Sequence, residues 1–190
     1  MRNIEVKKVR EMRNEVRISG FGGQGIVLAG VILGRGAALY DDKNAVQTQS
    51  YGPEARGGAS KSEVVISQEE IDYPKVIKPD VLVCMSQQAF DKYCRDIKEG
   101  GTVIVDRDLV TVPEDFYNGN VKVYKIPFTE IAYKDIGLKI VANMVMLGAL
   151  VRITGIVSKE AIRKAILDSV PKDTEEKNLM AFEKGYSYLK

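Results

Sequence analysis

The sequence predicts an α/β protein, a three-layer sandwich with a mostly parallel sheet and a helical C-terminal section. Over residues 17–40 a β-branched segment runs into glycines and then into a long apolar segment, which indicates a strand, a tight turn and a helix. Over residues 80–106 a strand, a helix and a glycine turn precede another strand, a succession typical of parallel pairing with a right-handed crossover. Beyond Pro127 the remaining apolar segments are helical in character.

The N-terminal half supplies three strands and one helix. Residues 17–19 are the first strand, and residues 25–40 form a helix whose side chains are apolar on nearly every face. We therefore expect this helix to be buried between layers. Residues 45–49 are a short polar strand, and residues 62–67, with the sequence SEVVIS, are the third strand.

The second half alternates strands with helices and then becomes helical. Residues 80–85 are a buried strand, and a helix over 87–97 follows. The later predicted elements are strands over 100–106 and 121–126 and helices over 140–153, 158–169 and 174–189. Ser158 caps the helix that follows it, although the acidic residue of a capping box is missing. Because no interior linker or repeat interrupts residues 1–190, we expect a single domain with an N-terminal arm at residues 1–16.

Composition excludes several classes of function. The chain has 190 residues, a hydrophobic content of 45% and a formal net charge of +2, with scattered basic residues, so we expect no nucleic-acid partner. No apolar segment has the ~18 residues that a membrane helix needs, and the charged N-terminus lacks the apolar core of a signal peptide. The sequence therefore predicts a cytoplasmic protein without membrane contact.

The chain lacks the residues of most catalytic and metal sites. It contains no histidine, which excludes Ser-His-Asp and Cys-His catalysis and removes a common metal ligand. The two cysteines, Cys84 and Cys94, are too few for an iron–sulfur cluster. Cys84 ends an apolar strand, where a free cysteine is usually a buried small hydrophobe. We therefore predict no catalytic residue and no metal site in this chain.

The strongest candidate for a binding site is a glycine turn after the first strand. It consists of Gly20, Gly22, Gly23, Gln24 and Gly25 and satisfies the pattern GxGxxG. Glycines let a phosphate or another backbone approach closely, at a helix N-terminus that attracts anions. A dinucleotide site also requires an acidic residue at the end of the second strand, and that strand ends in Gln49 and Ser50 instead. The turn fits a ligand or another protein, and a nucleotide-dependent dehydrogenase is the alternative.

Two separated motifs resemble a known family. The segments that carry the resemblance are GFGGQGIVLAG, QSYGPEARGGASKSEVVIS, PDVLVCMSQQAFDKY, GGTVIVD and NLMAFEKGYSYL. In this order they resemble the gamma subunit of the 2-oxoacid:ferredoxin oxidoreductases, from about residue 15 to the C-terminus. The resemblance implies a multisubunit enzyme that decarboxylates a 2-oxoacid with thiamine diphosphate, passes electrons through iron–sulfur clusters to ferredoxin, and releases an acyl-CoA.

The resemblance also implies a division of labour. Thiamine diphosphate, magnesium and the iron–sulfur clusters belong to partner subunits, namely alpha, beta and a ferredoxin-like delta, with an external ferredoxin as electron acceptor. Coenzyme A is the co-substrate of the complex. This chain has neither the cysteine sets nor the GDG-to-Asn stretch that those cofactors need. We therefore expect it to be inactive alone, to support assembly and to help receive coenzyme A.

The second motif contributes further candidate residues, Tyr51, Arg56, Gly57 and Gly58. In one interpretation Arg56 pairs with Glu54 or another surface acid. In the other its guanidinium binds a phosphate of coenzyme A or a carboxylate of a partner. Pyruvate-type gamma chains carry a more basic ERRGAP version of this loop, so the sequence here favours the 2-oxoglutarate type. The alternatives are the branched-chain and indolepyruvate types.

Overall fold

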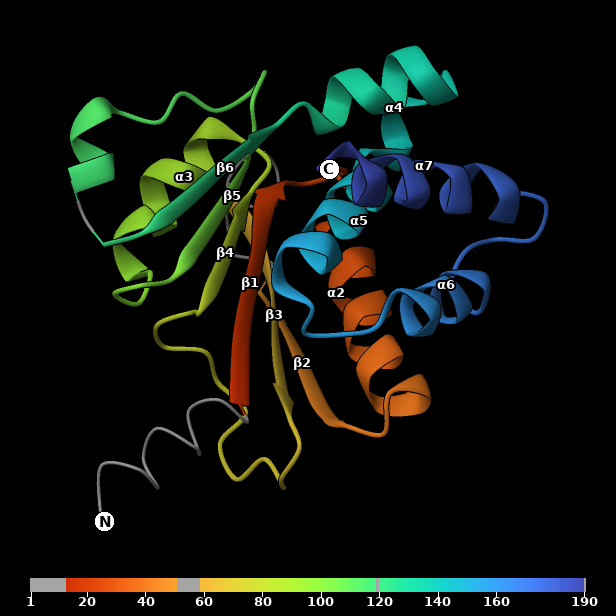
Figure 1. The fold of residues 1–190 in the computed structure, drawn as a ribbon, viewed down its shortest axis with the longest axis horizontal. Coiled ribbons are helices and arrows are strands. Elements are labelled where there is room, and N and C mark those ends of the chain that lie inside the picture. The colour runs from red at the N-terminus through yellow and green to blue at the C-terminus, as the bar shows by residue number, and fades with distance from the viewer. Residues whose placement is uncertain (1–12, 51–58, 119, 190) are drawn as a thin grey trace.

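The computed structural model describes residues 13–50, 59–118 and 120–189, and its central layer is a six-stranded mixed sheet (Figure 1). The strand order is β2-β3-β1-β4-β5-β6. The strands are β1 (Arg13–Phe21), β2 (Asn44–Ser50), β3 (Ala59–Ser67), β4 (Val81–Cys84), β5 (Thr102–Asp106) and β6 (Lys122–Ile126). β1, β4, β5 and β6 pair in parallel, whereas β3 runs antiparallel to both β1 and β2. This arrangement confirms the mostly parallel sheet.

Helices cover the two faces of the sheet unequally. The helices are α2 (Ile26–Arg35), α3 (Gln87–Tyr93), α4 (Phe128–Ile136), α5 (Ala142–Thr154), α6 (Lys159–Leu167) and α7 (Glu175–Tyr188). Short helical turns are η1 (Gly36–Tyr40), η2 (Cys94–Asp96), η3 (Glu114–Asn118) and η4 (Lys139–Val141). Figure 1 shows α2, α5, α6 and α7 on one side of the sheet and α3 on the other. The predicted three-layer α/β class is confirmed.

The alternation of side chains along the strands creates two cores. In β1, Val16 and Ile18 face the larger helical layer, and the intervening Arg17 and Ser19 face the α3 side. The smaller core holds Leu82 and Cys84 of β4 with residues of β5 and α3. Cys84 is fully buried, in agreement with its prediction as a small hydrophobe. In the described part of the chain, no helix has the length and apolar character needed to cross a bilayer.

The first strand is longer than the sequence analysis predicts. β1 begins at Arg13, so residues 13–16, assigned above to the N-terminal arm, belong to the sheet, and residues 1–12 lie outside the described residues. The charged side chains of this segment suggest a solvated arm in the sequence, but residues distant in the chain partner them. Arg13 Nη2 donates to the carbonyl oxygen of Tyr73 at 2.8 Å, and Lys98 Nζ lies 3.8 Å from Glu15 Oε2.

Two helices differ from their predictions. α4 occupies a segment for which the sequence analysis identifies no helix, and its N-terminus is capped from a distance. Asp106 Oδ2, at the end of β5, accepts hydrogen bonds from the backbone N–H of Thr129 at 3.0 Å and from its hydroxyl at 2.6 Å. The segment 25–40, predicted as one helix buried on nearly every face, forms α2 and η1. Val27 and Val31 of α2 are only half-buried, and Leu39 of η1 is exposed.

Candidate functional site

The glycine turn lies at the carboxyl end of β1, where the sheet changes its winding direction. From β1 the chain passes through α2 to β2 and β3 on one side, and from β4 it passes through α3 to β5 on the other. α2 and α3 lie on opposite faces of the sheet (Figure 1). The crevice beyond the carboxyl ends of two such strands is the usual ligand site of open α/β sheets. The fold therefore places the predicted motif where a binding site is expected.

The side chain of Gln24 bridges β1 and β4 at this crevice. Its Oε1 accepts from the backbone N–H of Phe21 at 2.9 Å, and its Nε2 donates to the carbonyl oxygen of Met85 at 2.7 Å. The backbone N–H of Met85 donates to the carbonyl oxygen of Ser19 at 2.8 Å. Because Gln24 spans the two strand ends, it holds the turn in position.

The turn is also held from the opposite side by α5. Asn143 Nδ2 donates to the carbonyl oxygen of Gly25 at 3.2 Å. Gly25 has a φ of 70°, and a Cβ at this position would collide with the side-chain amide of Asn143, so only glycine fits. Gly23 also has a positive φ, 93°. The sequence analysis missed Asn143, although an isolated polar residue inside the apolar segment 140–153 is a signal that could have identified it.

The described residues on either side of the second motif, the end of β2 and the start of β3, lie at this same end of the sheet. Tyr51, Arg56, Gly57 and Gly58 lie outside the described residues, so the structure does not test them. Their described neighbours are in place: Ala59 pairs with Phe21 in the β1–β3 ladder, and the Ser60 hydroxyl donates to the carbonyl oxygen of Gly20 at 3.2 Å. The flanks of the second motif therefore adjoin the glycine turn.

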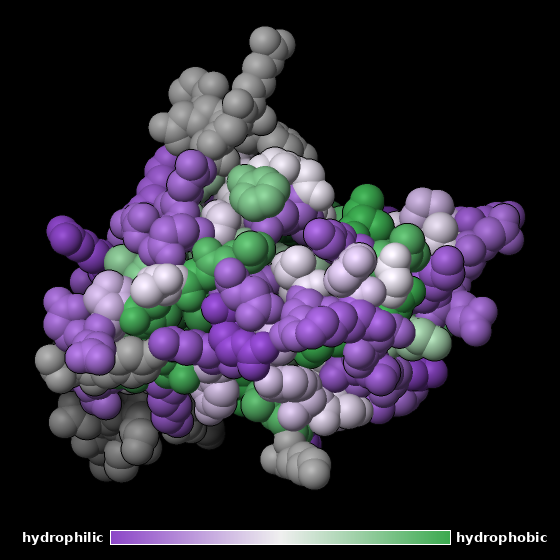
Figure 2. Space-filling model, turned by 90° about the horizontal axis from the view of Figure 1, so that it is seen from above, coloured by the Kyte–Doolittle hydropathy of each residue, from purple (hydrophilic) through white to green (hydrophobic). Residues whose placement is uncertain are grey.

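Two hollows adjoin the turn and share Gly23 and Ile140. The first, of about 430 Å³, lies between the turn, the start of α5 and the α6–α7 connection. The second, of about 450 Å³, lies between the turn and α4, with Phe21, Leu109 and Thr129 in its wall. The side chain of Ile140, which borders both, is 73% exposed. Figure 2 views this end of the molecule and shows apolar patches separated by hydrophilic residues.

The two cysteines are poorly suited to bind a metal. Burial raises the pKa of the Cys84 thiol to about 12, and burial is also the main reason that the pKa of Cys94 is raised. Neither thiol therefore favours the thiolate that an iron–sulfur cluster needs. No three His, Cys, Asp or Glu side chains gather as metal ligands within the described residues.

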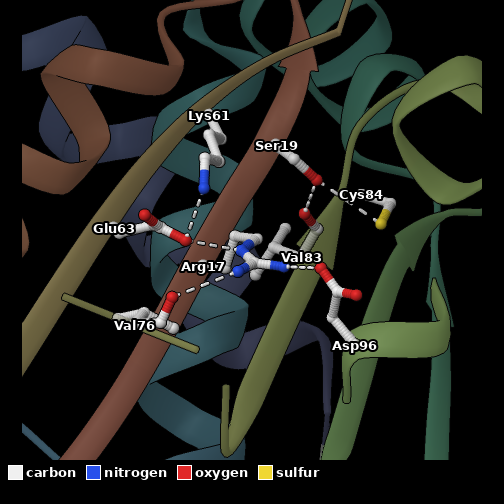
Figure 3. Close-up of polar contacts among 8 residues, drawn as sticks. All are labelled: Arg17, Ser19, Lys61, Glu63, Val76, Val83, Cys84 and Asp96. Atoms are coloured by element: carbon white, nitrogen blue, oxygen red, sulfur yellow. Dashed lines mark hydrogen bonds and ion pairs between the residues drawn. The ribbon is translucent and has the colours of Figure 1, made fainter. Parts of the chain in front are cut away.

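A second polar region lies further back along β1, on its α3 face (Figure 3). Arg17 is 3% exposed, and its Nε lies 2.7 Å from Glu63 Oε1. Its other nitrogens bond to the carboxylate of Asp96 and, at 3.4 Å, to the carbonyl oxygen of Val76. Lys61 Nζ lies 2.9 Å from the same Glu63 oxygen. Two cations thus face two carboxylates, and the Arg17 cluster joins β1, β3 and η2.

The Arg17 cluster has a structural role. The guanidinium carbon of Arg17 lies 5.2 Å from the ring centroid of Tyr93, so α3 also packs on it. The charges of Arg17 and Lys61 balance those of Glu63 and Asp96. The sequence analysis missed the cluster because Arg17 is 46 residues from Glu63 and 79 from Asp96.

Comparison with known proteins identifies the family. Residues 15–188 match the family described as pyruvate ferredoxin/flavodoxin oxidoreductase. The chain belongs to this family. The resemblance to oxidoreductase subunits is thereby confirmed over nearly all of the sequence.

Individual members of the pyruvate ferredoxin/flavodoxin oxidoreductase family agree in sequence and structure. The 2-oxoglutarate synthase subunit KorC of Methanocaldococcus jannaschii is 71% identical over 184 residues, which are 97% of this chain and 98% of that protein. The gamma subunit of a keto/oxoacid ferredoxin oxidoreductase from Geobacter sulfurreducens superposes with a TM-score of 0.81 at 50% identity, covering 91% of this chain and 96% of that one.

A third relative shows the same fold at lower identity. The 2-oxoglutarate:ferredoxin oxidoreductase of Magnetococcus marinus, solved with 2-oxoglutarate, coenzyme A and succinyl-CoA bound, gives a TM-score of 0.80 at 24% identity. The match covers 94% of this chain but 32% of that chain. The fold described here therefore also occurs as one part of a longer polypeptide.

Proposed function

We propose that this chain is the gamma subunit of a cytoplasmic 2-oxoglutarate:ferredoxin oxidoreductase. The complex would oxidatively decarboxylate 2-oxoglutarate with coenzyme A, releasing succinyl-CoA and CO2 and reducing ferredoxin. The observation that carries the proposal is the 71% identity, over nearly the full length of both chains, to a 2-oxoglutarate synthase subunit. Relatives named for other 2-oxoacids have lower identities to this chain, 39% for a ketoisovalerate oxidoreductase subunit and 35% for a pyruvate synthase subunit.

The redox cofactors belong to the partner subunits in this proposal. Alpha, beta and a ferredoxin-like delta subunit would hold thiamine diphosphate, magnesium and the iron–sulfur clusters. The high pKa of Cys84 supports this division, because a buried neutral thiol is a poor cluster ligand. This chain then contributes surfaces for assembly and for coenzyme A.

The carboxyl end of β1 is the proposed contact for coenzyme A. Three features support it: the position of the glycine turn at the switch point of the sheet, the hollows beside Gly23, and the flanks of the Arg56 motif at the same end. Coenzyme A occurs in the Magnetococcus marinus structure, which shares the fold. In this arrangement the Arg56 guanidinium binds a phosphate of coenzyme A bidentately.

Steady-state kinetics on the assembled complex test this contact. Lysine cannot reproduce the planar fork of arginine, so Arg56→Lys should raise the KM for coenzyme A and leave the KM for 2-oxoglutarate little changed. Arg95→Lys is the matched control, because Arg95 lies on η2, away from the glycine turn. An unchanged KM for coenzyme A would reject the phosphate contact, and loss of assembly would assign Arg56 to a subunit interface.

Assembly is tested separately from ligand binding. The isolated chain should bind no thiamine diphosphate and show no oxidoreductase activity, whereas co-expression with the partner subunits should restore activity. Size-exclusion chromatography should show the complex, since a stable interface buries at least ~1,000 Å². Turnover by the pure chain would overturn the proposal.

A further inference from the structure

The two edge strands of the sheet, β2 and β6, are protected differently. β6 has five residues, and its exposed Lys122 and Lys125 are charges of the kind that keep a strand edge from pairing with another chain. β2 has seven residues, with the sequence NAVQTQS, and carries neither a charge nor a proline. Its pairing with β3 advances one residue at a time from Asn44 to Ser50, so no bulge twists it. β2 therefore lacks the usual devices that prevent edge pairing.

The outer side of β2 is accessible in the part of the chain that the structure describes. β2 ends the strand order and pairs there with β3 (Figure 1). Asn44, Gln49 and Ser50 are exposed and the residues between them are half-buried, whereas eight of the nine residues of β3 are buried. About half of the backbone N–H and C=O groups of an antiparallel strand point away from a single partner. β2 thus offers a row of backbone donors and acceptors to a further strand.

The sequence of β2 is self-complementary in the antiparallel direction. Full overlap of two copies places Gln47 opposite itself, Val46 opposite Thr48, and Ala45 opposite Gln49. Val46 and Thr48 are both β-branched, and such residues pack well across neighbouring strands. No like charges meet, because the strand has none. The same overlap of two β6 strands would bring the lysines of both copies to one seam, so charge favours self-pairing at β2 and opposes it at β6.

We propose that β2 pairs with β2 of a second copy of this chain, antiparallel and around a two-fold axis that passes beside Gln47. The two six-stranded sheets then form one continuous sheet of twelve strands. A two-fold interface uses the same patch of both copies, which is what a self-complementary strand provides. Leu39 of η1, which leads into β2, is 64% exposed and adds apolar surface near the seam. This dimer requires no ligand and does not depend on the proposed function.

Sedimentation velocity on the full 190-residue chain tests the dimer. The wild type should pass from monomer to dimer as its concentration rises from about 1 μM to about 200 μM. Hydrogen exchange on the same samples should slow at the outward-facing amides of β2 at the higher concentration and stay unchanged in β6. A wild type that remains monomeric over this range, or β2 amides that exchange equally at both concentrations, overturns the proposal.

Two single substitutions test the register of the pairing. In the proposed dimer, Thr48 lies directly opposite Val46 of the other copy and diagonally, at about 7–8 Å, from Thr48 of the other copy. Thr48→Lys and Val46→Glu each bring like charges together and remove the β-branched pairs. Each should raise the dissociation constant of the dimer at least about tenfold. Lys122→Glu, on the opposite edge strand, is the control and should leave the dimer unchanged.

A mixture of the two variants gives the decisive result. In a mixed dimer the new lysine of one copy lies directly opposite the new glutamate of the other, so an equimolar mixture of Thr48→Lys and Val46→Glu should dimerise again. Circular dichroism checks that both variants are folded. Folded variants whose mixture stays monomeric, or a dimer that neither substitution weakens, overturn the pairing. If either variant fails to fold, the hydrogen exchange of the wild type decides the question.

Discussion

The middle and the end of β1 are stabilised by opposite means. At Arg17 the chain buries charges that neutralise one another, and each donor has a partner inside the protein. At the glycine turn the contacts are made by uncharged amides, those of Gln24 and Asn143, beside two hollows. The charged region uses its hydrogen bonds to hold the fold together. The neutral region leaves space beside its hydrogen-bonded amides, which is what a binding site needs.

The largest effect is expected from breaking the charged region. Arg17→Leu should lower the free energy of unfolding by up to about 3–5 kcal/mol, because Glu63, 8% exposed, then keeps only Lys61 as its charged partner. Urea denaturation measures the change. Arg107→Leu is the control, because Arg107 bonds to Asp108 and Glu130 at the surface and its loss should be small. Equal effects of the two substitutions would show that the Arg17 cluster is not a stabilising centre.

The second largest loss of stability is expected from a substitution in the neutral region, at Gly25. Gly25→Ala combines a disfavoured φ with the contact to Asn143 and should cost at least the ~1–3 kcal/mol of backbone strain. Gly137→Ala separates the two causes, since Gly137 has a φ of 78° and no atom within 4 Å of the point that a Cβ would occupy. Thermal unfolding should rank Gly25→Ala as the worse. If the two cost the same, the Asn143 contact is unimportant.

Substitutions at Gln24, which also belongs to the neutral region, should cause a smaller loss of stability. Gln24→Met keeps the volume but removes both hydrogen bonds, at about 0.5–1.5 kcal/mol each. Gln24→Glu keeps the acceptor for Phe21 and loses the donor to Met85, so its ionised side chain faces a carbonyl oxygen. Chemical denaturation should show a loss for both variants. Unchanged stability in both would mean that the bridge between β1 and β4 does not hold the turn.

The smallest effect concerns a single buried carboxyl, Asp106. Burial raises its pKa despite the hydrogen bonds from Thr129 and Asp108. Its folded pKa therefore exceeds the ordinary value of 3.8, and the stability it contributes is fully present below that value and is lost as the pH rises through the folded pKa. Relative to the wild type, Asp106→Asn should gain stability as the pH rises from about 4 through the folded pKa of Asp106. A stability difference that is constant with pH would contradict this.

The features that sequence reasoning found are those encoded locally. The β-branched segments, the glycine turn and the Ser158 cap involve neighbours along the chain, and Ser158 Oγ does accept from the backbone N–H of Ala161 at 3.2 Å. α4 was missed because the residue that caps it, Asp106, lies 23 residues earlier in the chain, at the end of β5. The true start of β1 was missed because Arg13 and Glu15 look like solvated charges until the fold brings Tyr73 and Lys98 to them.

The candidate site divides in the same way. The glycine positions of the turn follow from the local pattern, whereas Asn143 contacts Gly25 across 118 residues. The first hollow forms only when α5 and α7 pack beside the turn, because Asn143 of α5 and Asn178 of α7 are part of its wall. Tyr51, Arg56, Gly57 and Gly58 remain predictions from the motif.

The central place of β1 has a consequence for synthesis of the protein. β1 is made before both of its neighbours in the sheet, which are β3, beginning at Ala59, and β4, ending at Cys84. A nascent chain shorter than this carries β1 with at least one unpaired edge, and unpaired edges invite pairing with other chains. Sheets built from such distant pairs also form slowly. Pairing of β1 with another chain therefore competes with folding until β4 has emerged.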